Sequence, residues 1–389
     1  MSAVAPPTAA QPVRRRSPVD RLLHHNETGL IGLIVLVTVI AEAAVPAFRA
    51  SGNDTQILDN AALVMIVAVG EALVITARQI DLSVGAILGL NAYLVGSAVG
   101  HIGFAGPLVG TVMALALGAL LGLGNGILIE RVKMPAIIAT LATLSIYGGL
   151  QVVVTHGSQL YSSQLPGWLG NILSTSWLGL SPLVWAAIVV VVIVALVARY
   201  TPWGRDIYAI GSNPEAAAYL GLRAGRRTYQ AFAACGALAG LAGMLYAGQY
   251  GNVDATAGAN FELTAIAAAV IGGVSLFGGS GSPLGAALGA LLLTEIENIL
   301  AVLKISIFAQ QTLQGAAIVI AVAAYSLLSR RLNRPVRRSL RVEAGQSRPP
   351  DQLAAEGPAG TSTLARSEPV SDSVSEQLPD RVTRKEPSA

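Results

Sequence analysis

A few polar side chains lie inside long apolar stretches of this sequence. Glu71 occupies the middle of one such stretch. Amide and hydroxyl groups lie inside others, at Asn91, Asn125, Thr140, Thr143 and Gln311. In hydrocarbon these groups need hydrogen-bond partners, so each either joins neighbouring helices or contacts a polar solute. The sequence leaves both interpretations open, and a solute rich in hydroxyl groups suits this set of donors and acceptors.

The chain has no arrangement of side chains that is suited to catalysis. It contains no paired carboxylates and no Ser–His–Asp or Cys–His grouping, so no catalytic residue is predicted. The histidines follow no ligand spacing of the zinc type, and no metal site is expected. A glycine-rich phosphate loop ending in Gly-Lys-Ser/Thr is also missing, so this chain is not expected to hold ATP.

The composition is that of a membrane protein. The 389 residues are 53% hydrophobic and 12% charged, whereas soluble domains average about 25% charged residues. Four stretches contain no charged side chain, namely 102–129, 134–155, 178–198 and 305–329. Each is long enough to cross a hydrocarbon core of about 30 Å as a helix, which excludes a soluble enzyme. The basic residues flank the apolar stretches and form no stripe, which argues against nucleic-acid binding.

The apolar segments predict an all-α polytopic fold of about ten transmembrane helices. The predicted spans cover about residues 30–48, 61–78, 82–100, 105–129, 134–155, 182–199, 228–250, 262–278, 283–303 and 307–329. The sequence Ala41-Glu42-Ala43 looks like a signal-peptide cleavage site, but a retained span is preferred because the other spans need no cleavable signal. Glycines such as Gly118 and Gly236 predict close packing between helices.

Positive charge sets the predicted orientation. With the N-terminus in the cytoplasm, all but two of the 25 Lys and Arg residues fall on the cytoplasmic side, the exceptions being Arg49 and Lys304. Both termini are then cytoplasmic. Residues 1–29 are predicted to form a polar N-terminal segment and 30–330 the transmembrane domain. Residues 331–389 are predicted to form a disordered cytoplasmic tail, because they hold too little apolar surface to offset the entropy of ordering.

An internal repeat links two of the predicted spans. Asp81-Leu82-Ser83 opens the third span, and Glu262-Leu263-Thr264 opens the eighth, so acid, leucine and hydroxyl recur in the same order. A carboxylate at this position stabilises a helix N-terminus, and this role is preferred for both acids over solute binding.

The spans that follow these motifs also match. Residues 116–121 and 287–292 both read ALGALL, and Lys133 and Lys304 lie at the same distance beyond them. Because the copies are five spans apart, they must cross the membrane in opposite directions, which is typical of inverted repeats that build a pathway between two halves. Chance matching of short Ala/Leu strings is the alternative.

A polar segment between the sixth and seventh spans predicts a short helix on the cytoplasmic side. Asn213 is a good N-cap, Pro214 suits the first helical position, Glu215 complements the positive helix end, and Gly221 can adopt the left-handed conformation that ends a helix. A helix of two turns needs something to pack against. That is either this chain's own surface or a groove on a partner, and the candidate docking residues are Asn213, Glu215, Ala216, Ala217, Leu220 and Gly221.

Several short motifs are spread along the membrane part of the chain. They are residues 78–85 (RQIDLSVG), 125–126 (NG), 135–141 (PAIIATL), 204–205 (GR), 211–213 (GSN) with 216–217 (AA), and 261–263 (FEL) through 272–273 (GG). Together they resemble the permease subunits of bacterial ABC importers for simple sugars, of the ribose, xylose, rhamnose and autoinducer-2 type. The resemblance covers about residues 30–330.

The resemblance implies that residues 213–221 are the family's coupling helix, which sits in a cleft of a cytoplasmic ATP-binding subunit. It also implies a second permease chain, identical or different, and an extracytoplasmic solute-binding protein, all at the inner membrane of a bacterium. ATP and Mg would be bound by the ATPase partner and no cofactor by this chain. The implied function is inward passage of a sugar or sugar-like solute.

Two details favour the autoinducer-2 branch. Gln79 stands where the family usually has glycine, as in the autoinducer-2 and rhamnose branches, and residues 294–298 (TEIEN) with 302–305 (VLKI) also look like the autoinducer-2 branch. Rhamnose and pentoses stay open as solutes. The alternatives are an ABC permease for branched-chain amino acids or nucleosides, and an ion-coupled secondary transporter with Glu71, Glu295 or Glu297 as carriers.

Overall fold

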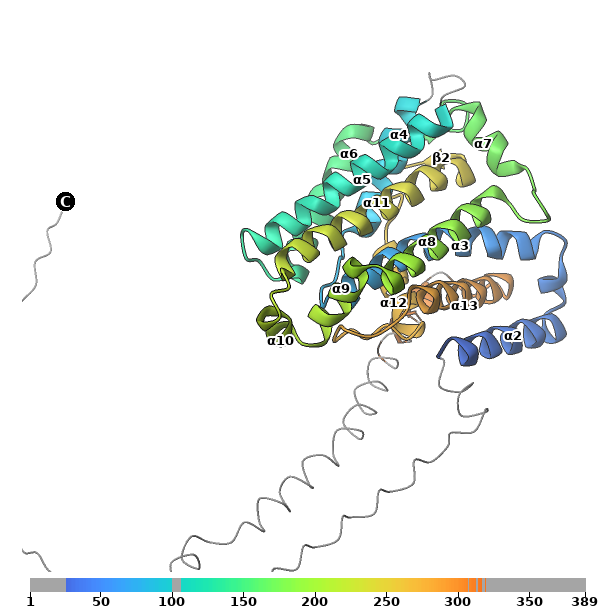
Figure 1. Cartoon of the computed structure of the whole chain (residues 1–389). Helices are drawn as coiled ribbons and strands as arrows, with labels where there is room; N and C mark the ends of the chain where they lie inside the picture. The colour runs from blue at the N-terminus through green and yellow to red at the C-terminus, as the bar shows by residue number, and fades with distance from the viewer. Residues whose placement is uncertain (1–25, 100–105, 307, 313, 317–318, 320–389) are drawn as a thin grey trace, which may run out of the picture. The chain divides into compact units, whose positions relative to one another are not determined.

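A computed structural model describes residues 26–99, 106–306, 308–312, 314–316 and 319 (Figure 1). The predicted N-terminal segment lies almost entirely outside these residues, as do the tail and most of the tenth span. The described part is mostly helical, as expected, and its only strands are the two-residue β1 (Leu160–Tyr161) and β2 (Asn252–Val253), which pair antiparallel.

Seven described helices are long and apolar enough to cross a membrane. They are α2 (Asn26–Ala44), α3 (Asn53–Thr76), α5 (Gly106–Glu130), α6 (Ala136–Thr155), α8 (Pro182–Tyr200), α11 (Ala224–Tyr250) and α13 (Pro283–Val302). Two shorter apolar helices are α4 (Val84–Ala98) and α12 (Phe261–Ile271). The connecting segments form the 3₁₀ helix η1 (Pro46–Arg49) and the helices α7 (Gly167–Ser174), α9 (Pro202–Ser212) and α10 (Pro214–Tyr219).

Each of the first nine predicted spans overlaps an apolar helix, but two of the predicted bounds were wrong. The span expected over 262–278 ends at Ile271, because the chain turns at Gly272 and then at Gly273, whose φ of 87° is left-handed. The span expected over 61–78 begins eight residues earlier, at Asn53, where the side-chain amide donates to the Phe48 carbonyl at 3.0 Å. Hydropathy missed this first part of α3 because it is polar.

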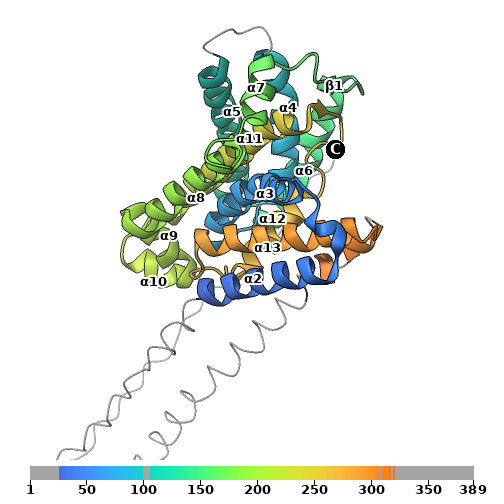
Figure 2. The ribbon, with the colours of Figure 1, turned by 90° about the vertical axis from the view of Figure 1, so that its right-hand side faces the viewer.

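The interior is built around α3 and α11. Helix α3 packs against α8, α12 and α13, while α11 packs against α4 and α5 (Figures 1 and 2). Where α5 meets α11 the backbones nearly touch: a Cβ added to Gly118 would lie 2.1 Å from the Gly236 carbonyl oxygen. This confirms the predicted close packing, which small residues permit in a membrane where lipid gives helices no hydrophobic drive to associate.

Helix α2 lies along α13 (Figure 2). Ala41 of α2 is buried with Phe48 and Ile57, and the Thr38 hydroxyl donates to the Glu295 carboxylate of α13 at 2.6 Å. The Ala41-Glu42-Ala43 sequence lies at the end of this helix, and the retained span stays a prediction.

Candidate functional site

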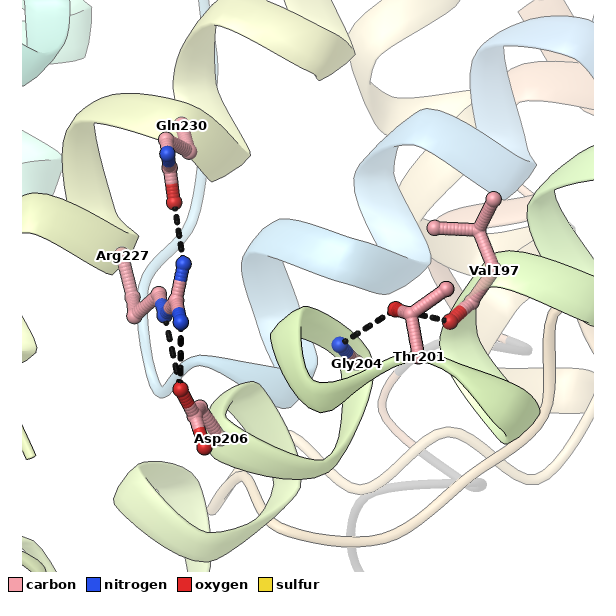
Figure 3. Close-up of polar contacts among 6 residues, drawn as sticks. All are labelled: Val197, Thr201, Gly204, Asp206, Arg227 and Gln230. Atoms are coloured by element: carbon pink, nitrogen blue, oxygen red, sulfur yellow. Dashed lines mark hydrogen bonds and ion pairs between the residues drawn. The ribbon is translucent and has the colours of Figure 1, made fainter.

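The connection between α8 and α9 is a tight corner that fixes the direction of α9. The Thr201 hydroxyl donates to the Val197 carbonyl at 2.7 Å and accepts from the Gly204 N–H at 3.1 Å, so it caps α9 while holding the end of α8 (Figure 3). A Cβ on Gly204 would lie 2.1 Å from the Ala198 carbonyl oxygen. The corner therefore requires glycine at this position.

An ion pair ties α9 to the first turn of α11. The Arg227 guanidinium donates to Asp206 Oδ2 from Nε at 2.9 Å and from Nη2 at 2.5 Å, and its Nη1 donates to the Gln230 side chain at 2.8 Å (Figure 3). Both charged side chains are about one-fifth exposed, at 23% and 22%. The pair closes the loop that carries α10, since α10 lies between α9 and α11 in the chain.

The short helix predicted between the sixth and seventh spans is α10, and its local structure is as predicted. The Asn213 side-chain oxygen accepts from the Ala216 N–H at 3.0 Å, Pro214 opens the helix and Glu215 lies in its first turn. The chain leaves α10 through Gly221, whose φ of 75° is left-handed. Figure 1 shows α9 and α10 together at one end of the helices.

Apolar side chains on α10 and its C-cap are exposed. Tyr219 is 94% exposed and Leu220 is 78% exposed, and Glu215 and Ala216 are exposed beside them. Ala217 is different: it is 2% exposed and packs against this chain, so its prediction as a direct docking contact was wrong. On a helix this short one face must pack inward, and residue 217 lies on that face. The outward face offers an anchor of the kind that protein partners cover.

Helix α9 also contacts segments that reach into the membrane. The Tyr208 hydroxyl donates to the Gly281 carbonyl at 2.9 Å, and the Ser212 hydroxyl donates to the Gly279 carbonyl at 3.2 Å. The Gly279 N–H in turn donates to the carbonyl of Thr76, the last residue of α3, at 2.9 Å. Helix α9 is therefore hydrogen-bonded to the turn that joins α12 to α13, and this turn is in turn bonded to the end of α3.

Four polar residues predicted from sequence meet in one buried cluster. The Asn125 amide donates to the Ser83 hydroxyl at 2.7 Å and to both Asp81 oxygens at 3.2 Å. Asp81 accepts from the Ser83 N–H at 2.9 Å and from its hydroxyl at 2.7 Å, and Glu71 accepts from the Asp81 N–H at 3.1 Å. All four side chains are fully buried. The cluster joins α3, α5 and the start of α4, and contact of Glu71 or Asn125 with solute stays a prediction.

The remaining predicted pathway residues bond mainly within their own helices. Asn91 donates to the Ile87 carbonyl at 2.9 Å, Thr140 to the Ala136 carbonyl at 2.9 Å, and Thr143 to the Ala139 carbonyl at 3.2 Å. Thr140 also reaches the Ile80 carbonyl at 3.3 Å, beside the buried cluster. Gln311 is exposed.

The two repeat motifs come close together. A Cβ on Gly85, in the first turn of α4, would lie 2.3 Å from Glu262 Oε2 and 2.4 Å from the Gly258 carbonyl oxygen. The glycine that ends the 78–85 motif is therefore needed so that the segment before α12 can approach α4. Thr264, the hydroxyl of the second motif, accepts from the Gln314 amide at 2.6 Å.

A cavity of about 300 Å³ with many polar lining residues lies between α3, α11, α12 and α13, and Gln310 after α13 also lines it. Its lining includes Gln56, Asn60, Tyr250, Phe261, Thr264, Thr294, Glu297, Asn298 and Gln310. Sequence reasoning singled out Thr264 as a repeat residue, Glu297 as an ion carrier in the secondary-transporter alternative and residues 294–298 as a branch motif, but it placed none of the lining residues in the solute pathway. A signal was present, since Thr294, Glu297 and Asn298 recur at the spacing of one helix face and mark a polar stripe on an otherwise apolar span.

A family match and similar proteins both place this chain among transport-system permeases. Residues 55–322 match the family described as the permease component of the branched-chain amino acid transport system. The autoinducer 2 import system permease protein LsrC of Photorhabdus laumondii subsp. laumondii is 36% identical over 287 residues, which cover 73% of this chain and 85% of that protein. LsrC of Enterobacter sp. (strain 638) is 38% identical over 284 residues, which cover 73% of this chain and 82% of that protein.

A third relative, LsrC of Escherichia coli, is 39% identical over 251 residues, which cover 64% of this chain and 72% of that protein. No solved structure shows significant similarity to the chain. The matched residues run from α3 to beyond α13 and so contain both the buried cluster and α10. The chain belongs to this family of ABC transport-system permeases and is a multi-pass protein of the inner membrane.

Proposed function

We propose that this chain is the transmembrane permease subunit of an ATP-driven importer that carries autoinducer 2, or a related sugar-like solute such as rhamnose or a pentose, into the cytoplasm. The names of the relatives support this solute class over branched-chain amino acids. The observation that carries the coupling to ATP is α10, a capped helix that displays Tyr219 and Leu220 outward.

The partner that covers this outward face is a cytoplasmic ATP-binding subunit. Asn213, Glu215, Ala216, Leu220 and Gly221 contact its groove, while Ala217 anchors α10 to the permease. ATP and Mg are bound by that subunit and not by this chain. An extracytoplasmic solute-binding protein delivers the solute, and a second permease chain completes the membrane part.

Movement passes from α10 into the membrane through α9. ATPase closure displaces α10, and α9 follows because Arg227 and Asp206 close the loop around α10. The bonds from Tyr208 and Ser212 then act on the turn before α13, and Gly279 passes the displacement to the end of α3. Two arrangements of the helices would then alternate in opening the pathway to either side.

The architecture we propose has ten spans, cytoplasmic termini and an inverted repeat, with the permease domain at 30–330 between a polar segment (1–29) and a disordered tail (331–389). Reciprocal packing supports the repeat: α3 of the first half packs on α12 and α13, and α11 of the second half packs on α4 and α5. Lys133 and Lys304 also adopt the same left-handed conformation, with φ of 63° and 58°.

Two measurements test the proposed function. The first co-expresses the permease with its ATPase subunit and measures how much ATPase is recovered with the permease. The second measures uptake of autoinducer 2 by proteoliposomes that contain the transporter and the solute-binding protein. Leu220→Arg should reduce both at least tenfold, because a charge replaces the apolar anchor of α10. Val132→Arg is the matched control, since Val132 is a 59% exposed apolar residue at the turn after α5. Normal recovery and uptake with Leu220→Arg would contradict the coupling role of α10.

A further inference from the structure

The cavity between α3, α11, α12 and α13 has the position of an entry site. Helix α11 begins just after α10 and ends at Tyr250, which lines the cavity. Its 27 residues correspond to about 40 Å at the rise of an α-helix. The cavity therefore lies at the far end of the helices from α10, which is the extracytoplasmic side in the proposed orientation.

The lining presents uncharged donors and acceptors from different helices. Asn60 of α3 and Tyr250 of α11 are already joined, since the tyrosine hydroxyl donates to the amide oxygen at 3.0 Å. Thr294 and Asn298 of α13 also line the cavity, as does the aromatic ring of Phe261. Polar groups converging on a small cavity with aromatic walls are typical of sites for small polar molecules.

Two of these groups are buried and have no partner among the described residues. Thr294 is 4% exposed and its hydroxyl makes no hydrogen bond there. The side-chain oxygen of Asn298 is likewise buried and unbonded. Buried polar atoms in proteins normally have a hydrogen-bond partner. Two lining residues whose buried polar atoms lack one therefore indicate a place for a ligand that supplies hydrogen-bond donors and acceptors.

The charge of the lining selects the kind of ligand. Glu297 is the single ionisable acid among the lining residues, and none of the described lining residues is basic. A solute with its own carboxylate, such as an amino acid, would meet a like charge with no cation to bind it. A neutral solute with several hydroxyl groups would donate to Glu297 and Asn298 and exchange bonds with Thr294.

We propose that this cavity binds a neutral polyhydroxylated solute on its way across the membrane. The inference rests on the proposed function, because it names where the permease first holds that solute. It assigns a binding role to Thr294, Glu297 and Asn298, which lie on one face of α13.

Chemical labelling tests this site without relying on transport. The chain has one cysteine, Cys235, which is buried in α11, so Cys235→Ala gives a background free of thiols. In the full transporter, Asn298→Cys is labelled with a membrane-impermeant methanethiosulfonate, with or without millimolar autoinducer 2, D-ribose or leucine. Gln56→Cys, at an exposed position on α3 that lines the same cavity, is a second reporter if Asn298→Cys folds poorly.

At least one neutral solute should slow labelling of the cavity cysteine threefold or more, and leucine should leave it unchanged. Tyr161→Cys, at a 58% exposed position on β1, is the control and should be labelled equally in all conditions. Equal labelling of both cavity cysteines in every condition, or protection by leucine alone, would overturn the site. Uptake by the unaltered transporter is measured separately, so loss of the site and failure of the proposed function give different results.

Discussion

Arg227 and Asp206 form a two-point contact, in which Nε at 2.9 Å and Nη2 at 2.5 Å both donate to the same carboxylate oxygen. The two residues are 21 positions apart, and α10 lies between them. The contact therefore ties the middle of α9 to the start of α11. The ion pair thus closes the segment that contains α10.

A double-mutant cycle measures this contact. Arg227→Ala and Asp206→Ala should each lower the thermal stability of the detergent-solubilised protein slightly, and the double variant should show a coupling of about 0.5–1 kcal/mol, since exposed and half-exposed ion pairs rarely exceed that. Autoinducer 2 uptake should fall more than stability does, because the loop loses its orientation. Full uptake in all three variants would contradict the positioning role.

The features that sequence predicted well are local. The cap at Asn213 and the left-handed turn at Gly221 depend on residues within a few positions of α10, and their side-chain chemistry alone specifies them. The apolar helices follow from length and hydropathy. Hydropathy does not identify the start of α3, because this part of the helix is polar. Asp59 is buried there only with the help of a hydrogen bond from the Ser181 hydroxyl, which is 122 residues away in the sequence.

The candidate site was predicted only in its parts. For Glu71 and Asn125 the sequence left open a hydrogen bond between helices or contact with a solute, and Asp81 was expected to stabilise a helix N-terminus; the structure places all three in one hydrogen-bonded cluster. Nothing in the spacing of residues 44 positions apart, such as Asp81 and Asn125, indicates contact. The inward direction of Ala217 depends likewise on how α10 packs, which a helix of two turns does not specify by itself.

Asn125→Ala tests the buried cluster. It leaves the Asp81 carboxylate without one of its donors inside the protein, so we expect a loss of about 1–3 kcal/mol in stability. Thr143→Ala is the control, because Thr143 is buried in the neighbouring span but donates only to carbonyls of its own helix, so its loss leaves no group of another helix without a partner. Thermal unfolding in detergent compares the two, and equal losses would show that the cluster adds nothing.

Gly118→Ala tests the packing of α5 on α11. The added methyl group would lie 2.1 Å from the Gly236 carbonyl oxygen, and backbone cannot move aside cheaply. We expect a loss of about 1–3 kcal/mol, as for other overpacked sites. Gly148→Ala in α6 is the matched control, since no atom lies within 4 Å of its added Cβ. That variant should be neutral or slightly more stable because alanine favours helix.

Tyr208→Phe separates coupling from folding. It removes the hydroxyl that donates to the Gly281 carbonyl and keeps the ring, so stability should fall by only about 1 kcal/mol. If α9 transmits movement through this bond, autoinducer 2 uptake by the reconstituted transporter should fall severalfold while its ATPase subunit is recovered normally. Tyr200→Phe, at a 65% exposed position at the end of α8, should leave uptake unchanged. Unaltered uptake with Tyr208→Phe would place the transmission elsewhere, in the contact of Gly279 with the end of α3.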